Sequence, residues 1–81
     1  MANDNTEFLT LRILDTPAGQ EVANTFLATL FQTWDIGQST ERARQVAENN
    51  GTLKVLGFSA FIDFLTKIAP ILIRLGKSKS R

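Results

Sequence analysis

The amino-acid sequence predicts a small α+β domain with its elements in the order strand, helix, helix, strand, helix. Two observations lead to this prediction. Apolar and polar residues alternate from Leu9 to Ile13, and the segment TLRIL at 10–14 is nearly repeated as TLKVL at 52–56. The predicted sheet has two strands, or four if two chains join their sheets, with the helices on one face. The alternative is an all-α helical bundle in which the two short segments are extended linkers.

The first predicted strand is the segment around residues 9–13. Leu9, Leu11 and Ile13 alternate with Thr10 and Arg12, and a period of two is typical of a strand with one buried face. A helix is predicted to follow it. Thr16 is a good N-cap and Pro17 suits the first helical position. The apolar residues that follow at helical spacing are Val22, Ala23, Phe26, Leu27, Leu30, Phe31 and Trp34.

The second predicted strand, 52–56, is followed by a similar pattern. A shift of 42 residues places six apolar positions of the first helix, between Val22 and Phe31, on apolar residues near the C-terminus; Leu30, for example, falls on Leu72. This correspondence predicts two strand–helix units. A unit of this kind cannot bury its apolar face alone, so the sequence favours a homo-oligomer, either a dimer or a larger ring.

The connector between the two units is also predicted to contain a helix. The segment DIGQS at 35–39 indicates a turn with Gly37 as its left-handed residue. Ser39 would then cap a helix that ends at Gly51. The apolar residues on this helix are small and few, namely Ala43, Val46 and Ala47, so we expect it to pack lightly or to be mostly exposed. Its exposed Arg42 and Arg44 are most simply solvated.

The C-terminal helix is the most apolar part of the chain. It is predicted to start after Gly57, with Ser59 as N-cap, and Pro70 should bend it. Apolar residues cover more than half of its circumference, while Asp63 and Lys67 have the favourable spacing for an ion pair. Since this is more apolar surface than a small domain can hide, we expect an oligomer interface formed by Phe61, Phe64, Leu65, Ile68 and Leu72.

Charge is divided unevenly along the chain. Residues 1–50 carry seven acidic and three basic side chains, whereas residues 51–81 carry one acidic and six basic side chains, so their net charges are −4 and +5. A basic end beside an apolar helix is typical of proteins that bind anionic membrane surfaces. The residues expected to contact such a surface are Lys67, Arg74, Lys77, Lys79 and Arg81. Accordingly, we divide the chain into a flexible N-terminus (1–7), a single domain (8–76) and a basic C-terminal tail (77–81).

Composition argues against catalysis and metal binding. The chain has no Cys and no His, which removes disulfides, thiolate and imidazole metal ligands and the usual general base. The acidic residues are scattered without a paired spacing, so we expect no catalytic residue, metal or cofactor. The first 8 residues contain neither a basic region nor an apolar run, and we expect a cytoplasmic protein.

The function expected from these observations is a non-catalytic interaction or assembly protein that self-associates, or binds another protein, through its C-terminal helix. The first alternative is a peripheral membrane protein that uses the same helix and the basic tail. The second alternative is a weak nucleic-acid binder through the tail, and this is the least favoured because the tail has few cations and no aromatic residues.

Overall fold

The computed structural model describes residues 2–79, with side chains from residue 8 to residue 77, and this part of the chain is helical. Four α-helices are separated by short connections: α1 (Ala2–Leu14), α2 (Pro17–Thr33), α3 (Ile36–Asn50) and α4 (Phe58–Lys79). A 3₁₀ turn, η1 (Thr52–Lys54), lies between α3 and α4. No strand occurs between residues 2 and 79, so the predicted α+β fold is wrong and the all-α alternative gives the right class.

The first predicted strand is part of helix α1, and the reason lies in its apolar spacing. Leu9 and Ile13 fit a helix as well as they fit a strand, because residues four apart share one side of a helix and also one face of a strand. Thr10 and Ile13 are buried, whereas Leu11 is 63% exposed. Short apolar segments are ambiguous between the two periods. The helix makes its own backbone hydrogen bonds, whereas a strand here would need a partner strand.

The predicted repeat is also wrong, because the second segment does not resemble the first. Residues 52–54 form the 3₁₀ turn, and Val55 and Leu56 follow it as exposed residues. Thr52 is buried, and both its backbone N–H and its hydroxyl donate to Asn50 Oδ1, at 3.0 and 2.6 Å. The two segments are therefore similar in sequence but not in structure. Neither is the extended linker that the all-α alternative predicted.

Helix α2 begins as its sequence predicts. Thr16 is the N-cap and its Oγ1 accepts a hydrogen bond from the Gly19 N–H at 3.0 Å, with Pro17 at the first helical position. The same hydroxyl donates to the Ile13 carbonyl oxygen at 2.8 Å, which ties the end of α1 to the start of α2. Gly19 is buried directly against this carbonyl group: an added Cβ would lie 2.6 Å from the Ile13 carbonyl carbon. The corner between the two helices therefore leaves no room for a side chain at position 19.

The corner between α2 and α3 differs from the predicted one. Trp34, not Gly37, has the left-handed conformation (φ 54°), and its N–H donates to the Leu30 carbonyl oxygen at 2.7 Å. Asp35, not Ser39, is the N-cap of α3, since its carboxylate accepts from the Gln38 N–H at 3.0 Å. Ser39 is fully buried inside α3, where its hydroxyl donates to the Asp35 carbonyl oxygen.

Helices α2 and α3 form the most extensive contact between elements. Ser39, Ala43 and Ala47 of α3 are all buried, and small side chains allow two helices to approach closely. The expectation that this helix packs lightly is therefore wrong. As predicted, α3 ends at Gly51, which has φ 88°, and a left-handed residue at this position suits glycine. Asn50 also donates to the Ala18 carbonyl oxygen at 3.0 Å, joining the end of α3 to the start of α2.

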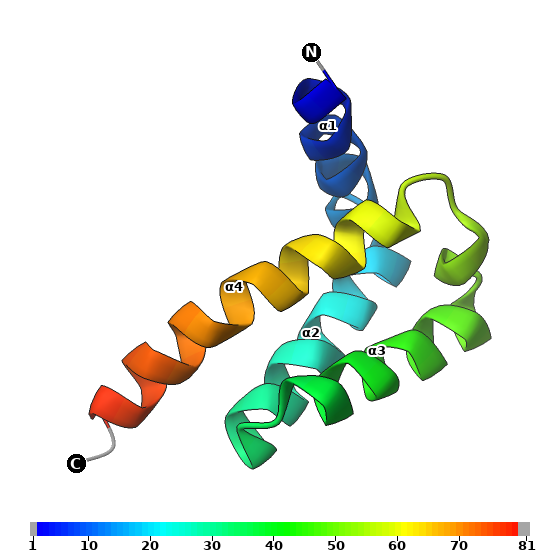
Figure 1. Ribbon diagram of the computed structural model, residues 1–81. Coiled ribbons are helices and arrows are strands. Elements are labelled where there is room, and N and C mark those ends of the chain that lie inside the picture. The colour runs from blue at the N-terminus through cyan, green and yellow to red at the C-terminus, as the bar shows by residue number, and fades with distance from the viewer. Residues whose placement is uncertain (1, 80–81) are drawn as a thin grey trace.

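Helix α4 crosses the other three and closes the core (Figure 1). It starts after Gly57, as predicted, but it begins at Phe58, so Ser59 lies within its first turn and is not the N-cap. The helix is continuous through Pro70, which lies on the exposed side. Phe61 and Leu65 are buried, and Phe61 is with Phe26 of α2 among the largest fully buried side chains. The Cα atoms extend over 39 × 31 × 19 Å, so the shortest dimension holds two layers of helices.

The C-terminal half of α4 is held to the rest of the protein by Trp34. A Cβ added to Gly76 would meet the end of the Trp34 indole, with Cζ3 at 2.9 Å, and Phe31 Cε1 at 3.5 Å. Phe31 and Trp34 pack edge to face, with their ring centroids 5.6 Å apart. The Trp34 indole can therefore occupy this position only because residue 76 has no side chain.

We predict that Gly19→Ala lowers the free energy of unfolding by about 1–3 kcal/mol, because the new methyl group would clash with a carbonyl group that cannot rotate away. Urea denaturation followed by circular dichroism would measure the loss. Gly37→Ala is the matched control: Gly37 is exposed inside α3, with Asp35 Oδ1 at 3.3 Å as the nearest atom to an added Cβ. Equal stabilities for the two variants would contradict the close packing at this corner.

We predict that Gly76→Leu displaces the Trp34 indole into solvent while the helix content is kept, since leucine favours a helix. Trp34 is the only tryptophan, so a red shift of its fluorescence and stronger quenching by iodide would report the displacement directly. Lys77→Leu adds the same side chain to an adjacent exposed position and should leave the fluorescence unchanged. An unshifted spectrum in Gly76→Leu would argue against this contact.

Candidate functional site

Packing divides the apolar surface of α4 into a buried and an exposed part. Of the five residues predicted to form an interface, Phe61 and Leu65 are buried within the monomer at 0% and 2% exposure. Ile68 and Leu72 are half-buried and pack against the core. Phe64 is 41% exposed. The two buried residues are thus unavailable to a partner while the protein is folded.

Apolar residues on the outer side of α4 form a continuous line, which we call the exposed stripe: the exposed Phe64, Ile71 and Leu75, together with the half-buried Ile68. Each member precedes a core-facing residue by one position. The spacing of four, three and four residues is the heptad spacing of helices that pack side by side. Ile71 and Leu75, at 53% and 56% exposure, were not in the predicted interface. Their heptad spacing from Phe64 was the signal in the sequence that could have identified them.

Basic residues lie beside the exposed stripe. Lys67 Nζ is 3.1 Å from Asp63 Oδ2, which confirms the predicted ion pair, and both side chains are largely exposed. Arg74 and Lys77 are exposed about two and three turns further along the helix. Three of the five residues expected to contact an anionic surface are therefore exposed on α4, and Lys67 and Arg74, seven residues apart, share one side of it. The Lys79 side chain and Arg81 lie outside the described residues.

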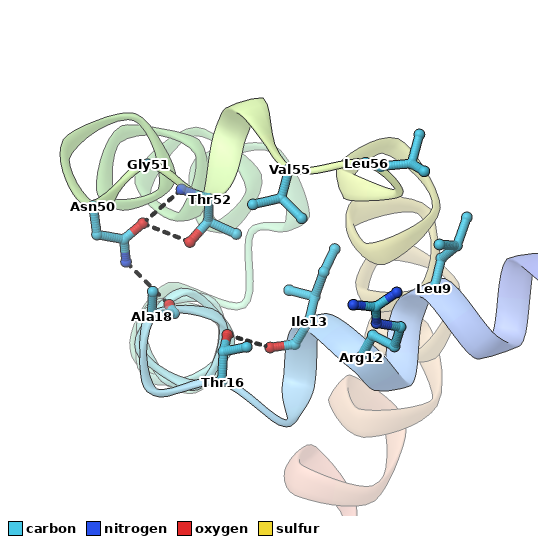
Figure 2. Close-up of a pocket in the computed structure, with 10 residues that line it drawn as sticks. All are labelled: Leu9, Arg12, Ile13, Thr16, Ala18, Asn50, Gly51, Thr52, Val55 and Leu56. Atoms are coloured by element: carbon cyan, nitrogen blue, oxygen red, sulfur yellow. Dashed lines mark hydrogen bonds between the residues drawn. The ribbon is translucent and has the colours of Figure 1, made fainter.

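A separate pocket lies between α1, the start of α2 and the connection from α3 to α4 (Figure 2). Its volume is about 340 Å³. The apolar lining comes from Leu9, Ile13, Ala18, Val55 and Leu56. In Figure 2 the side chains of Ile13 and Val55 point toward each other across the gap between α1 and η1, while Leu56 points outward.

The polar groups around this pocket differ in their hydrogen bonding. The Thr16 and Thr52 hydroxyls donate to the Ile13 carbonyl oxygen and to Asn50 Oδ1, at 2.8 and 2.6 Å. The Asn50 amide donates to the Ala18 carbonyl oxygen and to Glu21. Arg12 is the one charged residue among the described residues of the lining. Its guanidinium carbon lies 5.7 Å from the centre of the Phe8 ring, and among the described residues no carboxylate pairs with it.

A more open hollow lies between η1, α3 and the first turns of α4. Its volume is about 520 Å³, and Arg44 and Asp63 lie on its rim with Leu53, Phe58 and Ile62 among the lining residues. Arg44 is thus the arginine of α3 that borders a concave surface. The two rim charges have opposite signs, so the hollow presents no concentration of one charge.

The described residues contain neither a cluster of metal ligands nor a helix suited to crossing a membrane. Among them, no group of three or more Asp and Glu residues comes close enough together to hold a metal ion. Within the same part of the chain, none of the helices has the length and apolar character needed to cross a membrane. Two surface features of the described part of the chain are candidates for binding: the exposed stripe, with basic residues near it, and the pocket beside Arg12.

Comparison of the chain with family models, with curated proteins and with solved structures gave no match.

Proposed function

We propose that this protein is a small non-catalytic assembly protein, and that two copies pair through the exposed stripes of their α4 helices. The observation that carries the proposal is the heptad spacing of Phe64, Ile68, Ile71 and Leu75 on a helix whose other apolar face already fills the core. Apolar residues that lie at heptad spacing along three turns of a helix suit a second helix as the partner.

Charge favours an antiparallel arrangement of the two α4 helices. If the two-fold axis passes between Ile68 and Ile71, Phe64 of one chain lies opposite Leu75 of the other. The end that carries Asp63 then lies near the end that carries Arg74 and Lys77. A parallel pair would instead place Arg74 beside its own copy. Exposed ion pairs contribute up to about 1 kcal/mol each, so charge sets the orientation and the apolar stripe supplies the affinity.

The dimer should be weak and dependent on concentration. From Phe64 to Leu75 the helix rises about 16 Å and is about 10 Å wide, which gives a contact of a few hundred Å² per chain. Stable interfaces bury about 800 Å² per partner. We therefore expect monomer and dimer to exchange rapidly at micromolar concentrations, with the dimer predominant only at high protein concentration.

We predict that Ile71→Glu abolishes this dimer without unfolding the protein, because Ile71 is already half-exposed in the monomer. Sedimentation equilibrium over a hundredfold range of concentration would measure association, and thermal denaturation would measure stability. Leu56→Glu is the matched control, since Leu56 is 80% exposed and lies outside the stripe. Phe61→Glu should unfold the monomer. A wild-type chain that stays monomeric throughout, or a dimer lost equally in Leu56→Glu, would refute the proposal.

The second candidate function is binding to an anionic membrane surface, and the observation that favours it is that Lys67 and Arg74 are exposed seven residues apart on the helix that carries the apolar stripe, with the exposed Lys77 near its end. Apolar residues would enter the interface while the cations bind lipid headgroups, each contributing about 1 kcal/mol near the surface. The dimer and the membrane would compete for the stripe, since either one covers Ile71 and Leu75.

We predict that the double variant Arg74→Gln, Lys77→Gln separates the two functions. It keeps the apolar stripe, so dimerisation should change little, whereas capture by vesicles of phosphatidylcholine with one third phosphatidylserine should fall several-fold. Arg42→Gln, Arg44→Gln on α3 is the control with the same change in net charge. If the wild-type chain does not cosediment with these vesicles at low salt, the membrane candidate is excluded.

A further inference from the structure

The pocket beside Arg12 is separate from the stripe on which the proposed function depends. It is lined by residues of α1, by Thr16 and Ala18 at the start of α2, and by residues 50–52, 55 and 56. None of them belongs to α4. A role for this pocket would therefore be independent of whether the protein dimerises or binds a membrane.

The lining calls for a ligand with an apolar body. Leu9, Ile13, Ala18 and Val55 supply hydrocarbon surface, and apolar area exceeds polar area in the lining. A volume of about 340 Å³ is at the lower end of the range for pockets that bind small molecules. The ligand should thus be a short chain or a single ring.

The charge at the rim calls for an anionic group on that ligand. The hydroxyl protons of Thr16 and Thr52 and the Asn50 amide already donate to protein acceptors. Arg12 differs from these groups in its hydrogen bonding. Its guanidinium has five N–H donors, and it lies over the face of the Phe8 ring. In Figure 2 the Arg12 side chain emerges between those of Leu9 and Ile13, at the edge of the apolar surface. Among the described residues, no carboxylate lines the pocket to neutralise this charge.

We propose that this pocket binds a small organic anion with an apolar body, of the class of medium-chain carboxylates. Arg12 binds the carboxylate through two parallel N–H donors, the arrangement for which a guanidinium is best suited. The chain of the ligand lies against Ile13 and Val55 and reaches toward Ala18. The Phe8 ring, packed on the guanidinium, limits the orientations that Arg12 can adopt.

The affinity should be modest, because the pocket is open on one side and the ligand is small. A carboxylate with eight carbons has ten non-hydrogen atoms, and at a few tenths of a kcal/mol per atom the dissociation constant is about millimolar. Such an interaction is within reach of amide chemical-shift titrations on the full-length chain.

The experiment is a titration of the full-length protein with octanoate, below its micelle concentration, followed by amide chemical shifts. We expect saturable shifts at residues 9–18 and 50–56. Butyrate, which has the charge but little apolar body, and octylammonium, which has the apolar body but the opposite charge, should each bind about tenfold more weakly. Shifts that cluster instead at Phe64, Ile71 and Leu75 would overturn the assignment to this pocket.

Two variants test the roles of Arg12 and of the cavity. Arg12→Gln should weaken octanoate binding about tenfold, the effect of losing one charge-assisted hydrogen bond, whereas Arg42→Gln should leave it unchanged. Ala18→Leu should fill the cavity and also weaken binding, with the spectrum of the free protein showing that the fold is kept. Equal octanoate affinity in the wild type and Arg12→Gln would overturn the proposal. Because Arg12 lies outside the stripe, this result would leave the dimer proposal standing, and loss of the dimer in Ile71→Glu should not alter octanoate binding.

Discussion

The structure depends on the packing of one face of α4 against the other three helices. Phe61, Leu65 and Ala69 form a buried line along α4, and Phe61 lies in the same core as Phe26 and Leu30 of α2. A chain of 81 residues without cysteine has no disulfide to add stability, so burial of apolar side chains, those of this face among them, must supply most of it. The exposed stripe follows from the same constraint. More than half of the circumference of α4 is apolar, and three shorter helices cover only one side of it.

The arrangement of helices α1, α2 and α3 allows them to cover the buried face of α4. Small buried residues bring α3 close to α2, and the absence of a side chain at Gly19 lets α1 turn sharply into α2. Trp34 then fills the space between the end of α2 and the last turns of α4 and contacts Gly76. The large Trp34 side chain is thus placed where the helices diverge, whereas glycine and small residues are found where the helices approach each other closely. This distribution explains how a chain with few large residues on α3 still forms a closed core.

The two binding proposals use different residues for different physical reasons. The exposed stripe offers a flat apolar surface with basic residues near it, which suits an extended partner such as a second α4 or a lipid surface. The pocket beside Arg12 is concave and has a single cation at its rim, which suits a small anion. Since the Arg12 pocket and the stripe share no residue, a mutation can remove one and leave the other, and the experiments on the two can be interpreted separately.

The sequence by itself determined the local features whose causes are local. The N-cap at Thr16 with Pro17, the helix end at Gly51, the start of α4 after Gly57 and the ion pair between Asp63 and Lys67 were all predictable, because each depends on residues within one turn of each other. Only the tertiary structure decided between strand and helix at residues 9–13, since their apolar residues fit both periods and the choice depends on what packs against them. It also decided which apolar residues of α4 are core and which are exposed: Phe64 and Leu65 are adjacent in the sequence, yet Phe64 is exposed and Leu65 is buried in the core. The sequence pattern places Arg12 on the polar side of a strand. In the structure Arg12 lies at the rim of a pocket, because α1 and the connection between α3 and α4 lie side by side although they are about 40 residues apart in the chain.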